Sequence, residues 1–272
     1  MKQSKRRFNI AGPCIVEDHY LVSPLERVPE IKNLILSKSF FLLHAPRQCG
    51  KTTTIVHYVQ ELNKEGQVYA LYCSLENVQQ VEQAESGIPA IIDNMKTAFV
   101  RSRLPHSNTF AGKKNVYSYS TMLQNVITDI CEILDRPLVI FFDEADCLSN
   151  HTLVSFLRQL RNGYIGRAQK IPFPVSVGLI GLKSIRDYKA SVRENDDTLG
   201  TSSPFNVVSK SLTMHNFSLA DIQDLYHQHT AETGQRFEEN ICACVMDWTD
   251  GQPWLVNAIA NCVNSRKTMS AP

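Results

Sequence analysis

Short apolar runs alternate with amphipathic stretches over the first three quarters of the chain. Five runs have the length and composition of buried parallel strands, and they cover residues 40–43, 67–73, 138–142, 175–181 and 205–212. Between them, apolar residues recur with helical spacing at residues 55–62, 78–104, 122–134 and 153–160. This alternation predicts an α/β fold, in which helices sandwich a five-stranded parallel sheet.

From residue 214 onward the pattern becomes helical only. Ser218 and Asp221 have the spacing of a capping box, which predicts the start of a helix. A second helix should carry the apolar residues Phe237, Ile241, Val245 and Trp248, and a third should begin at Pro253 and run through Leu255, Ile259 and Cys262. We expect four segments: an N-terminal arm and adenine-side segment (1–37), a core (38–213), a small helical lid (214–265) and a tail (266–272).

Two polar stretches interrupt the predicted core. Residues 101–118 and 190–204 are rich in polar residues, Gly or Pro; the first is predicted to be an exposed loop and the second a flexible loop.

The loop after the first predicted strand carries the strongest chemical signal. It matches the P-loop pattern G-x-x-x-x-G-K-[ST], with Ala45 in place of the first Gly, and a helix follows it as the motif requires. Backbone N–H groups of such a loop, together with the N-terminus of the helix, bind phosphates. Lys51 is expected to reach the β- and γ-phosphates, and the Thr52 hydroxyl to bind Mg²⁺. The predicted nucleotide-binding residues are Ala45, Pro46, Arg47, Gln48, Cys49, Gly50, Lys51, Thr52 and Thr53.

Two carboxylates end the third predicted strand. Asp143 and Glu144 follow five apolar residues, so they lie at the carboxyl end of a buried strand, where open α/β sheets bind ligands. This is a Walker B pattern, which predicts that Asp143 holds Mg²⁺ and that Glu144 polarises the attacking water.

Two further groups of residues allow two interpretations each. Tyr20, Val22 and Leu25 lie in the arm ahead of the first strand, where they would either contact adenine or cover the edge of the sheet. Arg158 and Arg161 share one side of a predicted helix, which is either a solvated face or a source of a cation for a neighbouring subunit's γ-phosphate.

Composition excludes several classes of protein. The chain has 272 residues, 43% of them hydrophobic, and a net charge of +1, as in an ordinary soluble globular protein. This balance leaves nucleic acid open as a partner without indicating it. The basic N-terminus lacks a following apolar stretch, and the eight cysteines contain no C-x-x-C pair. A reduced, cytoplasmic protein without a membrane segment is therefore expected.

Beyond these motifs, the chain resembles a family of bacterial AAA-like ATP-binding proteins, which belong with the AAA and STAND groups of P-loop ATPases. The resemblance rests on residues 8–14 (FNIAGPC), 17–20 (EDHY), 44–48 (HAPRQ), 186–189 (RDYK), 203–206 (SPFN) and 251–255 (GQPWL). It implies the strand order 5-1-4-3-2, a role for Arg186 as a γ-phosphate sensor, and a lid turn at Gly251–Pro253 that packs near adenine. The helix after Pro253 has no Arg or Lys between Trp254 and Asn264, so the second sensor of motor-type AAA proteins is absent.

The expected function is slow, Mg²⁺-dependent ATP hydrolysis by a module that acts as a nucleotide-dependent switch. In this interpretation Glu144, Lys51 and Arg186 are catalytic, Thr52 and Asp143 bind the metal, and Tyr20 and Pro253 lie on the adenine side. The alternative is a nucleotide-dependent assembly or scaffold module that does not hydrolyse ATP and serves an effector or a nucleic-acid-processing partner. A homo-oligomer in the ATP state is compatible with both.

Overall fold

The computed structural model describes residues 6–112, 116–182 and 208–268. Its centre is a five-stranded, wholly parallel sheet with the order β2-β3-β4-β1-β5, which confirms the expected order 5-1-4-3-2. The strands are β1 (Phe40–His44), β2 (Tyr69–Ser74), β3 (Leu138–Asp143), β4 (Ser176–Gly181) and β5 (Val208–Thr213).

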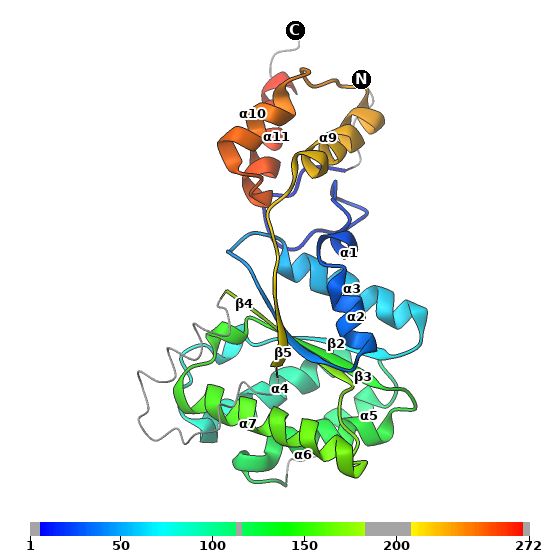
Figure 1. Ribbon diagram of the computed structural model, residues 1–272, viewed down its shortest axis with the longest axis vertical. Helices are drawn as coiled ribbons and strands as arrows, with labels where there is room; N and C mark the ends of the chain where they lie inside the picture. The colour runs from blue at the N-terminus through cyan, green and yellow to red at the C-terminus, as the bar shows by residue number, and fades with distance from the viewer. Residues whose placement is uncertain (1–5, 113–115, 183–207, 269–272) are drawn as a thin grey trace. The chain divides into compact units, whose positions relative to one another are not determined.

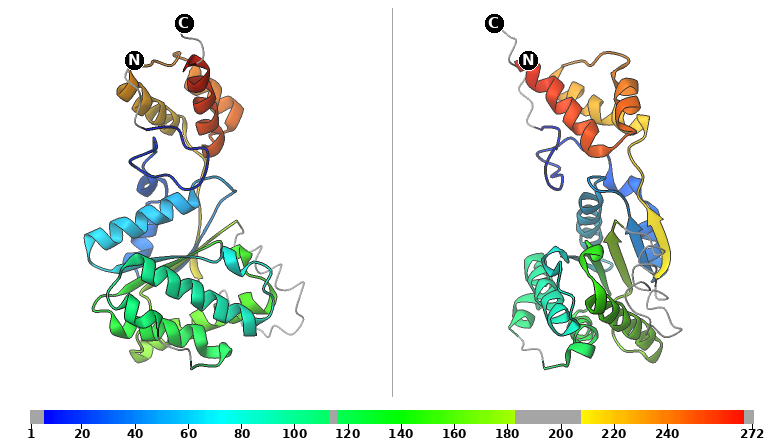
Figure 2. Two further views of the ribbon diagram at one scale, coloured as in Figure 1. Left: turned by 180° about the vertical axis from the view of Figure 1, so that it is seen from behind. Right: turned by 90° about the vertical axis from the view of Figure 1, so that its left-hand side faces the viewer.

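Helices cover both faces of this sheet (Figures 1 and 2). One face carries α4 (Ala84–Ser102), α6 (Tyr119–Ile133) and α7 (Asn150–Gly166), and the other carries α2 (Glu30–Leu36) and α3 (Lys51–Glu65). The short elements between Pro24 and Gln169 are α1 (Pro24–Arg27), α5 (Ser107–Ala111), η1 (Glu76–Val78), η2 (Ala145–Cys147) and η3 (Arg167–Gln169). No helix among the described residues is long and apolar enough to cross a membrane.

The middle strands are buried on both faces, as their near-continuous apolar sequences predict. Every residue of β3 and of β4 is buried. Gly178 in β4 lies between two aromatic rings, and a Cβ atom there would be 2.8 Å from Phe141 and 2.9 Å from Phe41. Glycine is therefore required at this position by close packing rather than by its backbone conformation.

The predicted exposed loop 101–118 is wrong for its first half. Residues 107–111 form α5, and the side chains of Leu104 and Phe110 are 8% and 5% exposed in the main core. Phe110 packs edge-to-face on Phe99 of α4. Two apolar residues within a polar stretch were too few to produce a periodic signal, although they were enough to hold the segment against α4. The predicted loop 190–204 and the start of the fifth predicted strand lie outside the described residues.

By contacts within the chain, the protein divides into two compact units. One contains the sheet and its helices (residues 29–45 and 55–213), and the other combines residues 1–28, 46–54 and 214–272. The second unit contains α9 (Leu219–Thr233), α10 (Ile241–Thr249) and α11 (Pro253–Thr268). The capping box at the start of α9 is confirmed: the Asp221 N–H donates to Ser218 Oγ, and the Asp221 carboxylate accepts from the Ser218 N–H.

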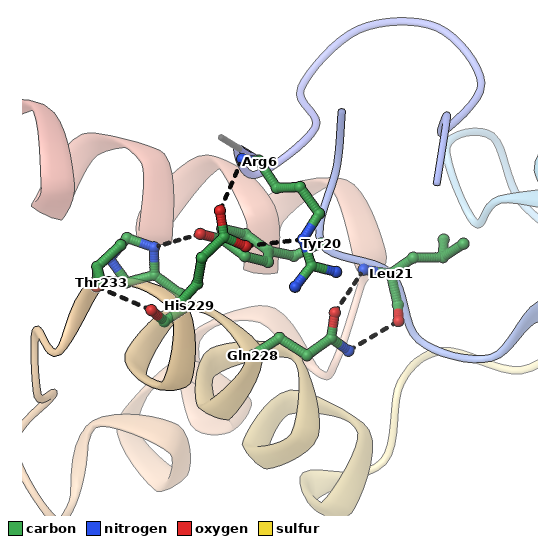
Figure 3. A network of polar contacts seen from close by, with 7 residues as sticks. Arg6, Tyr20, Leu21, Gln228, His229 and Thr233 are labelled. Carbon is green, nitrogen blue, oxygen red and sulfur yellow. Dashed lines mark hydrogen bonds and ion pairs between the residues drawn. The ribbon is translucent and has the colours of Figure 1, made fainter. Parts of the chain in front are cut away.

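In this second unit, the N-terminal arm packs into the core of the lid helices. Phe8, Tyr20 and Val22 share one buried cluster with Ile222, Val245 and other residues of α9–α11. The arm is also tied to α9 by polar contacts, which Figure 3 shows: an Arg6–Glu232 ion pair of 2.8 Å, and two hydrogen bonds between Gln228 and the backbone of Leu21. Neither expected role of Tyr20 and Val22, adenine contact or cover of the sheet edge, describes this packing.

The lid helices differ from the prediction in two respects. Phe237 precedes α10, which begins at Ile241. Trp248 is 71% exposed, and Leu255 and Cys262 are also exposed, whereas Val256 and Ala260 are fully buried, so the buried face of α11 is displaced by one position from the predicted apolar residues. Because residues 253–263 are apolar on several sides, helical periodicity alone did not distinguish these two faces.

The packing of the arm on the lid helices should become less stable at low pH because of His229. Its Nδ1 atom lies 3.1 Å from Tyr20 Oη, and burial lowers the pKa of its imidazole below the usual value. Below about pH 6.5 the imidazole is protonated in the unfolded chain but stays neutral in the folded chain. The free energy of unfolding should therefore decrease as the pH falls below about 6.5. Thermal unfolding between pH 7.5 and 5.5 measures this.

The His229→Asn variant should show a shallower pH dependence than the wild type. A remaining slope is expected, because burial also lowers the pKa of His19 in the arm. Parallel pH profiles for the two proteins would contradict the assignment to His229.

Candidate active site

The P-loop connects β1 to α3 and has the backbone that its sequence predicts. Gly50 has a φ of +87°, which explains the need for glycine there, and Gln48 also has a positive φ, of 61°. Helix α3 begins at Lys51, whose ammonium donates to the Pro46 carbonyl at 2.8 Å. Ala45 is buried and is not among the described residues with a positive φ, so its methyl group is accommodated without strain.

Arg27 supports the P-loop from the arm. Its Nη1 atom donates to the Cys49 carbonyl at 2.6 Å, and its Nη2 atom donates to the His215 carbonyl at 2.6 Å. The guanidinium also lies 4.8 Å from the centre of the Phe217 ring, and burial lowers its pKa to about 10. This residue was not predicted from the sequence, because a single Arg in a polar arm carries no signal of its own.

Two further hydrogen bonds hold the P-loop within the second unit. The Cys14 N–H donates to Thr53 Oγ1 at 3.1 Å, and the Cys49 thiol donates to Asn216 Oδ1 at 3.5 Å. The loop is thus bonded both to the arm and to residues 215–216, which lead into α9.

Asp143 lies at the carboxyl end of β3 and is 1% exposed. Its Oδ2 atom accepts a hydrogen bond from Tyr72 Oη at 3.0 Å, and its Oδ1 atom accepts one from the Glu144 N–H at 2.9 Å. These two bonds fix the orientation of the carboxylate.

Glu144 follows with a left-handed backbone, φ 57° and ψ 40°, and is partly buried. Burial raises the pKa of its carboxyl group, and the nearby charges of Glu76, Asp143 and Asp146 raise it further. The Cys147 thiol is its hydrogen-bond donor, with a distance of 3.8 Å from Sγ to Oε2. A carboxylate of raised basicity beside a strand end is suited to accept a proton from water.

Within the sheet unit, the start of the P-loop and Asp143 lie at the same edge. His44 pairs with Gly181, and the Ala45 N–H donates to the Gly181 carbonyl at 3.3 Å, so the ends of β1 and β4 coincide. Phe142 pairs with Leu179, which places Asp143 at that same edge of β3. The Asp143 carboxylate is a hard oxygen donor of the kind that Mg²⁺ prefers, and it lies at the carboxyl end of the strand.

The other residues that were candidates for nucleotide contacts lie in different environments. The Tyr20 side chain is 1% exposed and is covered by Phe8, His229 and Arg6, so its ring has no free face for adenine. Pro253 is buried as the first residue of α11. Arg158 is exposed and Arg161 is partly exposed on α7. Arg186 lies outside the described residues.

Solved structures share this fold at low sequence identity. A Walker-type ATPase of Pyrococcus abyssi is similar with a TM-score of 0.64 and 14% identity, over 92% of this chain and 69% of that one. The ORC1 protein of Aeropyrum pernix, solved in complex with DNA, gives 0.53 and 12%, over 91% and 61%. Cdc6p of Pyrobaculum aerophilum gives 0.55 and 14%, over 86% and 57%.

Sequence comparison gives the family directly. No curated protein matches the chain. The AAA-like domain family matches residues 30–271, which include the P-loop, the Asp143–Glu144 pair and the lid helices. The chain therefore belongs to the AAA-like domain family of P-loop ATPases.

Proposed function

We propose that this protein binds ATP together with Mg²⁺ and hydrolyses it slowly, as a nucleotide-dependent switch. Residues 45–53 bind the phosphates, Lys51 contacts the β- and γ-phosphates, and Thr52 and Asp143 hold the metal. Glu144 is the general base. Arg186 is proposed as the γ-phosphate sensor and Pro253 as an adenine-side residue, whereas the covered ring of Tyr20 makes it a structural residue of the arm.

The observation that carries the proposal is the arrangement at one edge of the sheet. The P-loop follows the end of β1, and the buried Asp143 with the adjacent Glu144 ends β3 two strands away. Gly50 and the N-terminus of α3 supply N–H groups for phosphate oxygens. A bound Mg²⁺ would neutralise charge on those oxygens. Glu144 would orient a water molecule and accept its proton.

The switch part of the proposal is supported by the bonds of the P-loop to the arm and the lid. Cys49 is held by Arg27 and Asn216, and Arg27 also binds the His215 carbonyl ahead of α9. A phosphate-induced change of the loop would alter these bonds. Occupancy of the P-loop can therefore bias the position of the segment that leads into the lid.

Substitution of Lys51 tests nucleotide binding. Lys51→Ala should weaken ATP binding by about 10- to 100-fold, because a hydrogen bond from a charged group contributes about 1.5–3 kcal/mol. Titration calorimetry with Mg²⁺ and ATP measures the change. The control is Lys64→Ala, which removes an ammonium from the other end of α3, where Lys64 is 77% exposed.

Equal affinities of the wild type and Lys51→Ala would contradict the assigned role of the P-loop. Tight binding without turnover in the wild type would contradict the hydrolysis step and favour the assembly module. In that case the size of the protein in solution should change with ATP.

A further inference from the structure

Tyr72 lies beside Asp143 on the neighbouring strand of the sheet. It belongs to β2, where its backbone pairs with Phe141, and its side chain extends along the sheet toward the end of β3. There its hydroxyl donates to Asp143 Oδ2 at 3.0 Å. The Tyr72 residue is half-buried.

The two oxygens of Asp143 are thus bound from two directions. Oδ1 accepts from the Glu144 N–H and Oδ2 accepts from Tyr72. A backbone N–H on one oxygen still permits the carboxylate to rotate, whereas a second donor on the other oxygen fixes the plane of the group. Partners of this kind, bonded to a ligand rather than to the metal, orient metal-binding carboxylates.

We propose that Tyr72 is a positioning residue, which orients the Asp143 carboxylate for the divalent cation that accompanies the nucleotide. This inference rests on the proposed function, because it takes Asp143 as a metal-binding residue. It adds a residue that no sequence motif indicates. In the sequence, Tyr72 is only one position of the predicted buried strand 67–73.

The same strand offers a matched control. At its other end, Tyr69 Oη donates to Asp135 Oδ1 at 2.8 Å, just before β3 begins. Both tyrosines therefore join β2 to an aspartate at an end of β3, and both lose only a hydroxyl group when Phe replaces them. If such bonds served only to hold the strands together, the two substitutions would have similar effects.

The test measures ATP binding by calorimetry at increasing Mg²⁺ concentrations, with the purified 272-residue protein. In Tyr72→Phe, the Mg²⁺ concentration needed for half of the Mg²⁺-dependent gain in affinity should rise about 10- to 100-fold. ATP binding without Mg²⁺ should stay at the wild-type level, as should the circular dichroism spectrum. Tyr69→Phe should give the wild-type titration.

A Tyr72→Phe titration that superimposes on the wild type would overturn the inference, and so would an equal shift in Tyr69→Phe. An Asp143→Asn variant completes a double-mutant cycle: adding Tyr72→Phe to it should cause no further shift, and two additive shifts would also overturn the inference. If wild-type ATP binding does not depend on Mg²⁺, the proposed metal site itself is wrong. If it does depend on Mg²⁺ and Tyr72→Phe has no effect, only the role of Tyr72 is wrong.

Discussion

Glu144→Gln should lower the rate of ATP turnover by about 10²- to 10⁴-fold, the range that a positioned general base contributes. Gln keeps the size of the side chain and an oxygen that can accept the hydrogen bond from Cys147. It cannot take a proton from water. ATP binding should therefore change little, since Glu144 is assigned to the proton and not to the phosphates.

Turnover measured as released phosphate, with affinity measured on the same preparations, checks this prediction. Glu132→Gln is the control, because it makes the same chemical change at an exposed position of α6. Turnover in Glu144→Gln equal to that of the control would remove Glu144 from the mechanism. A loss of affinity as large as the loss of rate would instead assign Glu144 to binding.

The middle strands can be located from the sequence because they are buried on both faces. A run such as residues 138–142 is continuously apolar, which is the pattern of a strand covered on both faces. The order of the strands is implied by the family resemblance rather than by these runs. The short helix α5 lacks such a pattern. Its one buried aromatic side chain, Phe110, is held by a tertiary contact with Phe99, and no local pattern encodes that contact.

The candidate site divides in the same way. Asp143 and the P-loop could be located because their motifs combine residue types with a strand–loop or strand–acid context, and the described backbone agrees with that context. Arg27 and Tyr72 act through contacts between residues far apart in sequence, so the chain gave no signal for either. The roles assigned to Arg186 and Pro253 and the likeness to STAND lids stay predictions.

The packing of the arm is likewise not encoded locally. Its apolar residues are expected to cover a surface, and no local pattern indicates which surface that is. Their partners, Ile222 and Val245, are about 200 residues away and belong to a different predicted segment. The lid is therefore built from both ends of the chain, and its stability should depend on contacts that join them.

At Gly251, the addition of a single methyl group should lower the stability of the lid. It has a φ of +67°, and its carbonyl accepts a hydrogen bond from the Phe217 N–H at 2.8 Å. A Cβ atom there would overlap the Phe217 carbonyl oxygen and would lie 2.9 Å from the carbonyl carbon. Because both neighbours are backbone atoms, no side-chain rotation can relieve the overlap.

Gly251→Ala should consequently destabilise the unit of arm, P-loop and lid by about 3–5 kcal/mol, more than the roughly 1–2 kcal/mol that a left-handed backbone alone costs an L-residue.

Gly234→Ala is the control that separates the cost of the left-handed backbone from the cost of the overlap. Gly234 has a φ of +75° at the end of α9, and a Cβ atom added there would have no neighbour within 4 Å. Urea unfolding followed by Trp248 and Trp254 fluorescence, both residues being in the lid helices, measures the two variants. Equal losses would mean that only the backbone conformation matters; a larger loss in Gly251→Ala would show that the contact between the Gly251 turn and the start of α9 holds the lid together.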